Sequence, residues 1–129
     1  MFKRLALLFA LPLAIAPNVA LADKEFVDSD GATYDCAEDP TVNISNGSGT
    51  FTFTGPCKEI NVNGSKLIVT VSDVDELNVN GASNAVTAEL IGAIRINGAK
   101  NKVTWKKAKA GKKPSVQSNG RGNAVAKAK

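Results

Sequence analysis

The sequence predicts an all-β fold, a small single-domain β-solenoid of about five short coils. The first observation is a recurring Asn-Gly pair, which stands in "NVNG" at residues 61–64 and 78–81, in "RING" at 95–98 and in "QSNG" at 117–120. The second is the alternation of apolar and polar residues around each pair, which is typical of short half-buried strands. The third is the spacing, because the glycines of successive pairs lie 17, 17 and 22 residues apart. Stacked copies of one strand–corner–strand unit account for all three.

Residues 1–22 have the features of a secretory signal peptide. Lys3 and Arg4 precede an apolar run from Leu5 to Ala16, and the segment closes with Ala20-Leu21-Ala22. A charged start, a short apolar run and a small-x-small ending are typical of a cleaved export signal, and the run is too short to span a membrane. We therefore expect an exported protein, periplasmic or extracellular, without a transmembrane segment.

Residues 23–41 precede the first recognisable repeat and are expected to form an N-terminal cap. The chain has two cysteines, Cys36 and Cys57. In an exported protein such a pair predicts a disulfide, which would tie the cap to the first coils. Free thiols or a metal pair are the alternatives, and a zinc site needs further ligands in a sequence that contains no histidine.

Residues 42–129 contain five copies of one pattern, in which apolar pairs flank the corner. The clearest copies begin at Leu77 and Ile94, a third begins at Ile60, and looser copies begin at Val42 and Val116. One two-stranded unit of this length cannot bury its apolar face alone, whereas a stack of such units does. Antiparallel hairpins in a small sandwich or barrel are the alternative. Hairpins do not require the turn to recur at one position, so the repeat favours the solenoid.

The recurring polar residues are predicted to form the corners of the coils. Asn and Gly both tolerate positive φ angles, so each Asn-Gly pair marks a turn. Asparagines that follow the glycines at a fixed interval are expected to stack as a buried ladder of amides. The alternative is that they point outward to bind sugar or water. The predicted corner and ladder residues are Asn63, Gly64, Asn80, Gly81, Asn84, Asn97, Gly98, Asn101, Asn119, Gly120 and Asn123.

Three repeat units, "NVNGSKLIVTV", "NVNGASNAVTAEL" and "INGAKNKVTW", carry a family resemblance, together with the Gly-Pro-Cys that precedes them. Over roughly residues 30–126 the chain resembles domain-of-unknown-function family 3060. Members of this family are short exported bacterial proteins with Asn/Gly-rich β-repeats. The resemblance implies a bacterial envelope setting and a β-solenoid fold. It brings no catalytic signature, cofactor or functional residue with it.

Charge is distributed unevenly along the chain. Residues 23–76 hold 11 acidic and 3 basic residues, and residues 77–129 hold 1 acidic and 11 basic residues, which gives net charges of −8 and +10. Sequence position follows the axis of a solenoid, so the molecule is expected to be an electric dipole. Such a dipole can steer an anionic partner to one end or favour head-to-tail association. Charged ends can also serve only to keep open sheet edges apart.

The basic half contains a Lys-rich loop, predicted at residues 105–114 within the longer step between Gly98 and Gly120. Such a loop suits lipid phosphate, an acidic glycan or nucleic acid. The export signal and the few aromatic residues disfavour nucleic acid, and a solvated loop without a partner is the alternative. The candidate anion-binding residues are Lys106, Lys107, Lys109, Lys112, Lys113 and Arg121.

Two further features have a structural and a functional interpretation. Trp105, the only tryptophan, is predicted to point inward above Ala88, and a sugar-stacking platform is the alternative. Four carboxylates form a weak candidate Ca²⁺ site, because stacked carboxylates repel one another unless a cation or water separates them. These carboxylates are Glu59, Asp73, Asp75 and Glu76.

Enzymatic chemistry is not expected. The sequence contains no histidine for acid–base work, no Gly-rich phosphate loop and no serine in a nucleophile-elbow motif. We expect an exported cell-envelope binding or structural module without a cofactor, which contacts an anionic surface through its basic end. One alternative is a periplasmic inhibitor or immunity protein that neutralises a toxin by binding it. A remote alternative is an enzyme that acts on acidic polysaccharide.

Overall fold

The computed structural model describes residues 24–27 and 30–129, so the predicted signal peptide lies outside the described residues. Within this part of the chain all regular secondary structure is β, and every strand pairing is parallel. The strands are β1 (Lys24–Val27), β2 (Ala32–Asp35), β3 (Thr41–Asn46), β4 (Gly49–Ser65), β5 (Leu67–Ala82), β6 (Ala85–Ala99), β7 (Lys102–Ala108), β8 (Ser115–Arg121) and β9 (Ala124–Lys127).

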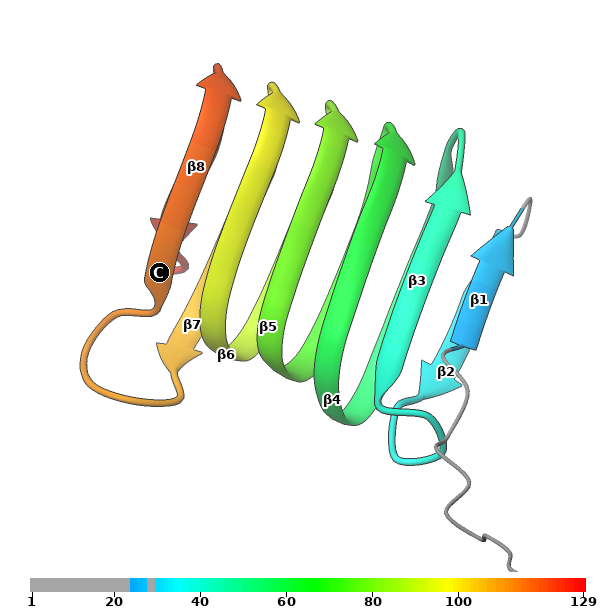
Figure 1. The fold of residues 1–129 in the computed structure, drawn as a ribbon. Coiled ribbons are helices and arrows are strands. Elements are labelled where there is room, and N and C mark those ends of the chain that lie inside the picture. The colour runs from blue at the N-terminus through cyan, green and yellow to red at the C-terminus, as the bar shows by residue number, and fades with distance from the viewer. Residues whose placement is uncertain (1–23, 28–29) are drawn as a thin grey trace, which may run out of the picture.

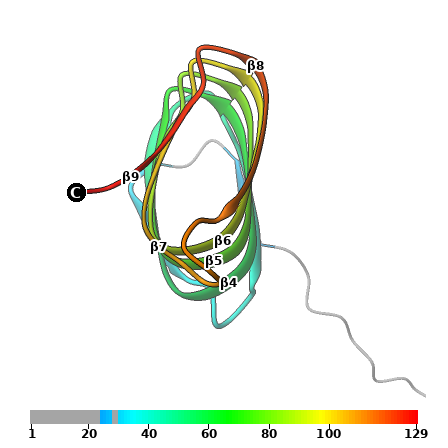
Figure 2. The ribbon, with the colours of Figure 1, turned by 90° about the vertical axis from the view of Figure 1, so that its left-hand side faces the viewer.

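The strands wind into one continuous β-solenoid of about six turns, which confirms the predicted fold class. Strands β4, β5 and β6 are long and bend at the base of the molecule, so each contributes to both walls (Figure 1). Viewed along the axis, the two walls enclose a narrow, elongated section (Figure 2). Successive coils pair residue above residue, as Ile60 pairs with Leu77 and Leu77 with Ile94.

The interior is filled by apolar side chains that alternate along each strand and stack from coil to coil. One inward column consists of Val42, Ile60, Leu77 and Ile94, all of them at most 1% exposed. On the opposite wall Trp105 lies directly above Ala88, as the sequence predicts, so a small side chain leaves room for the indole. Because each coil covers only its neighbours, the core grows with the number of coils.

The N-terminal segment is a coil rather than an irregular cap. Strand β1 pairs with β3, and β2 pairs with β4, both in the register that later coils keep. The ring of Phe26 packs edge-on against those of Phe51 and Phe53, with centroids 5.6 and 5.7 Å apart. This coil lacks the Asn-Gly corner, which is why the repeat pattern does not identify it and why the structure has about six coils instead of the predicted five.

The predicted disulfide is confirmed. Cys36 follows β2, Cys57 lies in β4, and the two Cα atoms of the bonded pair are 4.9 Å apart. The bond closes a loop whose ends are 21 residues apart in sequence. In the chain-entropy model this contributes about 3 kcal/mol. It fixes the connection after the first coil against the second.

The Asn-Gly pairs at residues 63–64, 80–81, 97–98 and 119–120 stand at strand ends just before each corner, and within each pair only the glycine has a positive φ. Gly81 and Gly98 have φ angles of +126° and +143°, whereas none of the described asparagines has a positive φ. The left-handed residues that follow are Lys66, Ser83 and Lys100, with φ angles of 57–58°. In each predicted Asn-Gly pair the glycine and not the asparagine thus adopts the positive φ, and the asparagine side chain has another role, described below.

Candidate functional site at the basic end

The Lys-rich loop emerges from the C-terminal end of the solenoid and joins β7 to β8. It comprises residues 109–114, which is shorter than predicted, because residues 105–108 continue strand β7 beside β6. Gly111 turns the chain with a φ of +69°, and Pro114 is buried at the end of the loop. The loop therefore has fixed points at both ends and exposes the side chains between them.

Lys109 anchors the start of the loop and is not a free cation. Its ammonium group lies 2.6 Å from Asp73 Oδ1 and also contacts the carboxylate of Asp75. Hydrogen bonds to Asp73 and then to Asp75 raise the pKa of Lys109 above its ordinary value. The side chains of Lys109 and Asp73 are 29% and 28% exposed, so solvent screens this contact less than it screens a surface ion pair.

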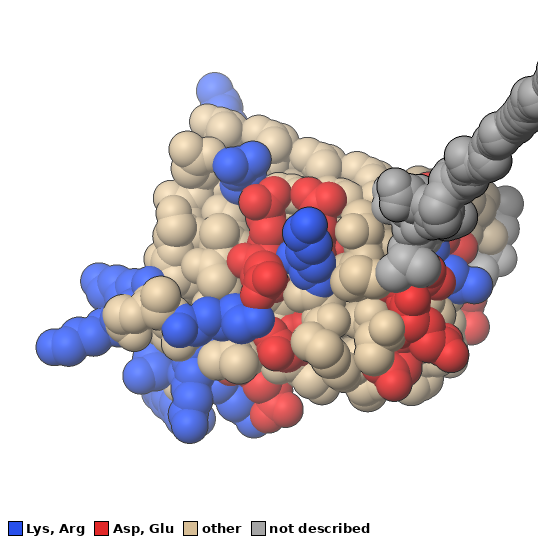
Figure 3. Space-filling view, turned by 60° about the horizontal axis from the view of Figure 1, so that its bottom comes forward, with Lys and Arg blue, Asp and Glu red and all other residues tan. Residues whose placement is uncertain are grey.

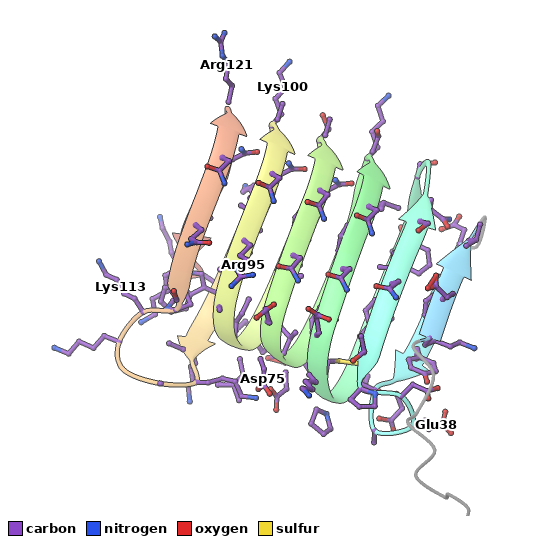
Figure 4. All side chains as sticks on the ribbon, in the orientation of Figure 1. Glu38, Asp75, Arg95, Lys100, Lys113 and Arg121 are labelled. Atoms are coloured by element: carbon purple, nitrogen blue, oxygen red, sulfur yellow. A yellow bond between two sulfur atoms is a disulfide. The ribbon has the colours of Figure 1, made fainter. Side chains whose placement is uncertain are left out.

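The six predicted anion-binding residues thus fall into two groups. The charge of Lys109 is compensated by its ion pairs with Asp73 and Asp75. Lys106 lies 3.4 Å from Glu89 in an exposed ion pair, which holds Lys106 only weakly. The other four have no ion-pair partner among the described residues: Lys107, Lys112, Lys113 and Arg121. Lys113 projects from the loop away from the body of the molecule, and Arg121 projects from the far end of β8 (Figure 4).

Two hollows beside the loop have Trp105 among their lining residues, although little of this side chain is exposed. Trp105 is 6% exposed, and Lys127 Nζ lies 5.8 Å from the ring centroid. Two surface hollows, of about 360 and 380 Å³, flank this pair, with Lys113 and Val116 lining one and Lys107 and Lys112 the other. The indole therefore packs as part of the core, and lysines are among the residues that line both hollows.

The weak candidate Ca²⁺ site is not supported by the arrangement of its carboxylates. Asp73 and Asp75 hold the ammonium of Lys109, which takes the place that a cation would occupy. Glu59 and Glu76 stack in register, as predicted, and both accept hydrogen bonds from the amide of Asn78. Among residues 24–27 and 30–129, no group of three or more His, Cys, Asp or Glu side chains could hold a metal ion.

The asparagines after the glycines line a buried corner. Asn84 and Asn101 are each 1% exposed, and Asn84 Nδ2 donates to Asn101 Oδ1 at 3.0 Å. Asn101 Nδ2 in turn donates to Asn123 Oδ1 at 3.2 Å and to the carbonyl oxygen of Gly81 at 3.0 Å. Each amide thereby satisfies backbone groups that the bend leaves unpaired. This arrangement fits the structural interpretation rather than sugar binding.

The asparagines of the Asn-Gly pairs form a second ladder on the outer surface. Asn80 Nδ2 donates to Asn63 Oδ1 at 3.1 Å, and the same bond joins Asn97 to Asn80 and Asn119 to Asn97. Their amides bridge neighbouring coils just before each corner. Their role is to hold adjacent turns in register, while the glycines bend the chain.

A third ladder was not predicted from the sequence. Asn61 Nδ2 donates to Asn43 Oδ1 at 2.8 Å, and Asn78 Nδ2 donates to Asn61 Oδ1 at 2.9 Å. Asn43 Nδ2 extends the row to Glu25 Oε1 at 3.1 Å. The sequence contains a pattern that could have predicted this ladder. The first asparagine of each "NVNG" recurs after 17 residues, so these asparagines occupy the same position in successive coils. Side chains two residues apart on a strand share one face, so the first and second asparagines of each "NVNG" lie on the same side of the sheet.

The opposite, N-terminal end of the solenoid is acidic and aromatic. The Tyr34 hydroxyl donates to Asp39 Oδ2 at 2.6 Å, Glu38 lies in the same connection, and Asp35 ends the preceding strand β2. Lys24 Nζ lies 5.5 Å from the ring centroid of Tyr34. The two ends of the molecule therefore differ in charge, as the sequence predicts.

We expect Tyr34 to ionise near pH 12 in the folded protein. Burial, the hydrogen bond to Asp39 and the charges of Asp39 and Glu38 raise its pKa from 10.0 to about 12. Since the folded pKa is the higher one, this contribution to stability is complete below pH 10 and is lost as pH rises through about 12. Tyr34 is the only tyrosine, so tyrosinate absorbance reports it alone. Asp39→Asn should lower the midpoint, and a folded midpoint near 10 would contradict the assignment.

The geometry defines a class of protein. It is a small parallel β-solenoid whose coils are joined by hydrogen-bonded asparagine ladders and whose C-terminal end is cationic. A family model described as "Protein of unknown function (DUF3060)" matches residues 44–89 and 72–122. The matches cover more than half of the chain, so the chain belongs to this family, which confirms the predicted resemblance. The searches of curated proteins and of solved structures each gave no significant match.

Proposed function

We propose that this chain is an exported, non-enzymatic binding or structural module of the cell envelope, which contacts an anionic surface through its basic end. The observation that carries the proposal is the set of exposed cations there that lack an ion-pair partner among the described residues: Lys107, Lys112, Lys113 and Arg121. Unneutralised charges at one end of a molecule attract an anionic partner over a distance of about 8–10 Å at physiological ionic strength.

The distribution of the other charges supports this orientation. On the face shown in Figure 3, most Lys and Arg side chains gather at one end, and Asp and Glu side chains occupy the middle and the opposite end. The acidic residues nearest the loop, Asp73, Asp75 and Glu89, are already paired with Lys109 or Lys106. They therefore do not neutralise the remaining lysines, and the molecule presents its basic end to a partner.

One observation supports the exported setting. The Cys36–Cys57 bond is of the kind that persists in oxidising compartments. No helix in the part of the chain that the structure describes is long and apolar enough to cross a membrane.

The test is binding to vesicles of phosphatidylglycerol and phosphatidylcholine and to an immobilised acidic polysaccharide. Wild-type binding to one of these surfaces should weaken steeply with added salt, because exposed charges are screened. Changing Lys107, Lys112 and Lys113 together to Ser should abolish it. Lys106 and Lys109 are left unchanged because they hold ion pairs, so the folding stability should be nearly unaffected.

The matched control removes the same charge elsewhere, with Lys58, Lys66 and Lys102 changed together to Ser; all three are exposed and lie outside the loop. This variant should bind as the wild type does. Equal weakening by both variants would show that net charge, and not the loop, decides binding. Undiminished binding by the loop variant would refute the proposal, and a tight complex with one protein would instead favour the inhibitor.

A further inference from the structure

Each end of the solenoid leaves two strands with an open edge. At the N-terminal end these are β1 and β2, and at the C-terminal end they are β8 and β9, since each of the four pairs with only one other strand among the described residues. Unpaired backbone groups on such an edge can accept a further strand. The four edges are not equivalent in length, because β1, β2 and β9 have 4 residues each and β8 has 7.

Two of the short edges, those of β1 and β9, are protected by lysines at inward positions. Lys24 of β1 stands in the column of Val42, and Lys127 of β9 stands in the column of Trp105. Their ammonium groups lie over aromatic rings, at 5.6 Å from Phe26 and 5.8 Å from Trp105. An inward-pointing charge makes the addition of another strand costly, because that strand would bury the charge.

Strand β8 has no such protection. All seven of its residues are exposed, its register with β6 is uninterrupted, and it contains neither lysine nor proline. The residues in its inward columns are Val116, which is 43% exposed, and Ser118, and neither would oppose a further strand. Among the described strands β8 therefore has the longest open edge, and no lysine or proline protects it.

We propose that the outer edge of β8 receives an extended, acidic segment of a protein partner by strand addition. Lys112 and Lys113 precede β8, and Arg121 ends it, so cations stand at both ends of the edge. Lys100 projects beside Arg121 from the end of the neighbouring coil (Figure 4). In this mode main-chain hydrogen bonds supply affinity, and the side chains of the added strand supply selectivity, here for Asp and Glu.

A second copy of this chain fits the edge less well. Two C-terminal ends would bring like charges together, which is unfavourable. Stacking the N-terminal coil of one copy on the C-terminal coil of another would place Lys24 on the column of Val116 and Lys127 on the column that begins at Tyr34. Two ammonium groups would then be buried in one apolar interior. The proposal therefore names a partner of different sequence.

The experiment uses a blocked heptapeptide that alternates Glu and Thr, and a second peptide with proline at its central position. Amide NMR spectra of the full chain should show shifts and slowed hydrogen exchange along β8 with the first peptide. The proline peptide should bind about tenfold more weakly, because it loses main-chain hydrogen bonds. This comparison uses the unmodified protein. Equal binding of the two peptides would overturn the proposal.

A variant separates strand addition from charge attraction. Ser118→Lys copies the protection seen at Lys127 and should weaken binding of the Glu-Thr peptide about tenfold, although it adds a positive charge. Ser65→Lys, at the exposed end of β4, is the matched control and should leave binding unchanged. Stronger binding by Ser118→Lys would reduce the interaction to electrostatics and overturn the proposal. Self-association that Ser118→Lys abolishes would overturn it in favour of a second copy.

The two proposals fail separately. Ser118→Lys retains every lysine of the loop, so vesicle or polysaccharide binding should persist in this variant. The Lys107, Lys112 and Lys113 variant tests the anionic surface, whereas the peptide comparison tests the edge of β8.

Discussion

Gly81→Ala is expected to lower the free energy of unfolding by roughly 3–5 kcal/mol. The φ angle of Gly81 is +126°, and a Cβ atom there would lie 1.9 Å from the carbonyl oxygen of Gly64 in the preceding coil. That oxygen cannot move aside freely, because it accepts a hydrogen bond from Asn84 Nδ2 at 3.1 Å. Urea denaturation followed by circular dichroism measures the loss.

Gly47→Ala is the matched control for this substitution. A Cβ atom at Gly47 would meet no heavy atom within 4 Å, and the φ angle of Gly47 is not positive. Its replacement should therefore change stability by no more than about 0.5 kcal/mol. Comparable stability of Gly81→Ala and Gly47→Ala would mean that the coils do not approach as closely as the corner geometry requires.

Asn101→Ala is expected to cost roughly 3–5 kcal/mol, the second large effect. Its carboxamide oxygen accepts from the backbone N–H and the side-chain amide of Asn84, and its Nδ2 donates to Gly81 and Asn123. Truncation leaves several of these buried groups without a partner. Because the groups cannot reach water, each lost bond costs more than a surface bond would.

The control is Asn97→Ala in the outer ladder. Asn97 is exposed and shares single amide bonds with Asn80 and Asn119, so water can replace them. We expect a loss of about 1 kcal/mol or less. Asn101→Asp adds a further comparison, since a carboxylate keeps the acceptor but cannot donate to the Gly81 carbonyl. If Asn101→Ala were as stable as Asn97→Ala, the buried ladder would not be a principal support of the corner.

The repeated part of the fold could be predicted from the sequence because, in a solenoid, residues at the same position of successive repeats contact one another. Leu77 and Ile94 hold the same position in their repeats, and they are neighbours in the structure for that reason alone. The position of Trp105 above Ala88 follows from the same rule. The local apolar pattern and the length of one repeat are enough to predict both of these contacts.

Parts of the structure that do not follow the repeat were not predicted from the sequence. The first coil has no Asn-Gly corner, and its strands could be identified only from their pairing with β3 and β4. Lys109 was assigned to the cationic surface because it stands in the Lys-rich loop, whereas its partner Asp75 lies 34 residues earlier, two coils away. Side-chain pairing across an irregular loop depends on where the loop folds, and residue type and spacing do not determine that.

The constant step between coils also has a genetic consequence. Asn78 lies 17 residues after Asn61, and Asn97 lies 17 residues after Asn80. Loss or duplication of seventeen codons within this region therefore removes or adds one rung and leaves every column intact, whereas a change of one codon would turn inward side chains outward. Such a gene can vary its length in whole coils by unequal recombination. The length of the protein is then a heritable quantity that changes in discrete steps, while both of its ends stay the same.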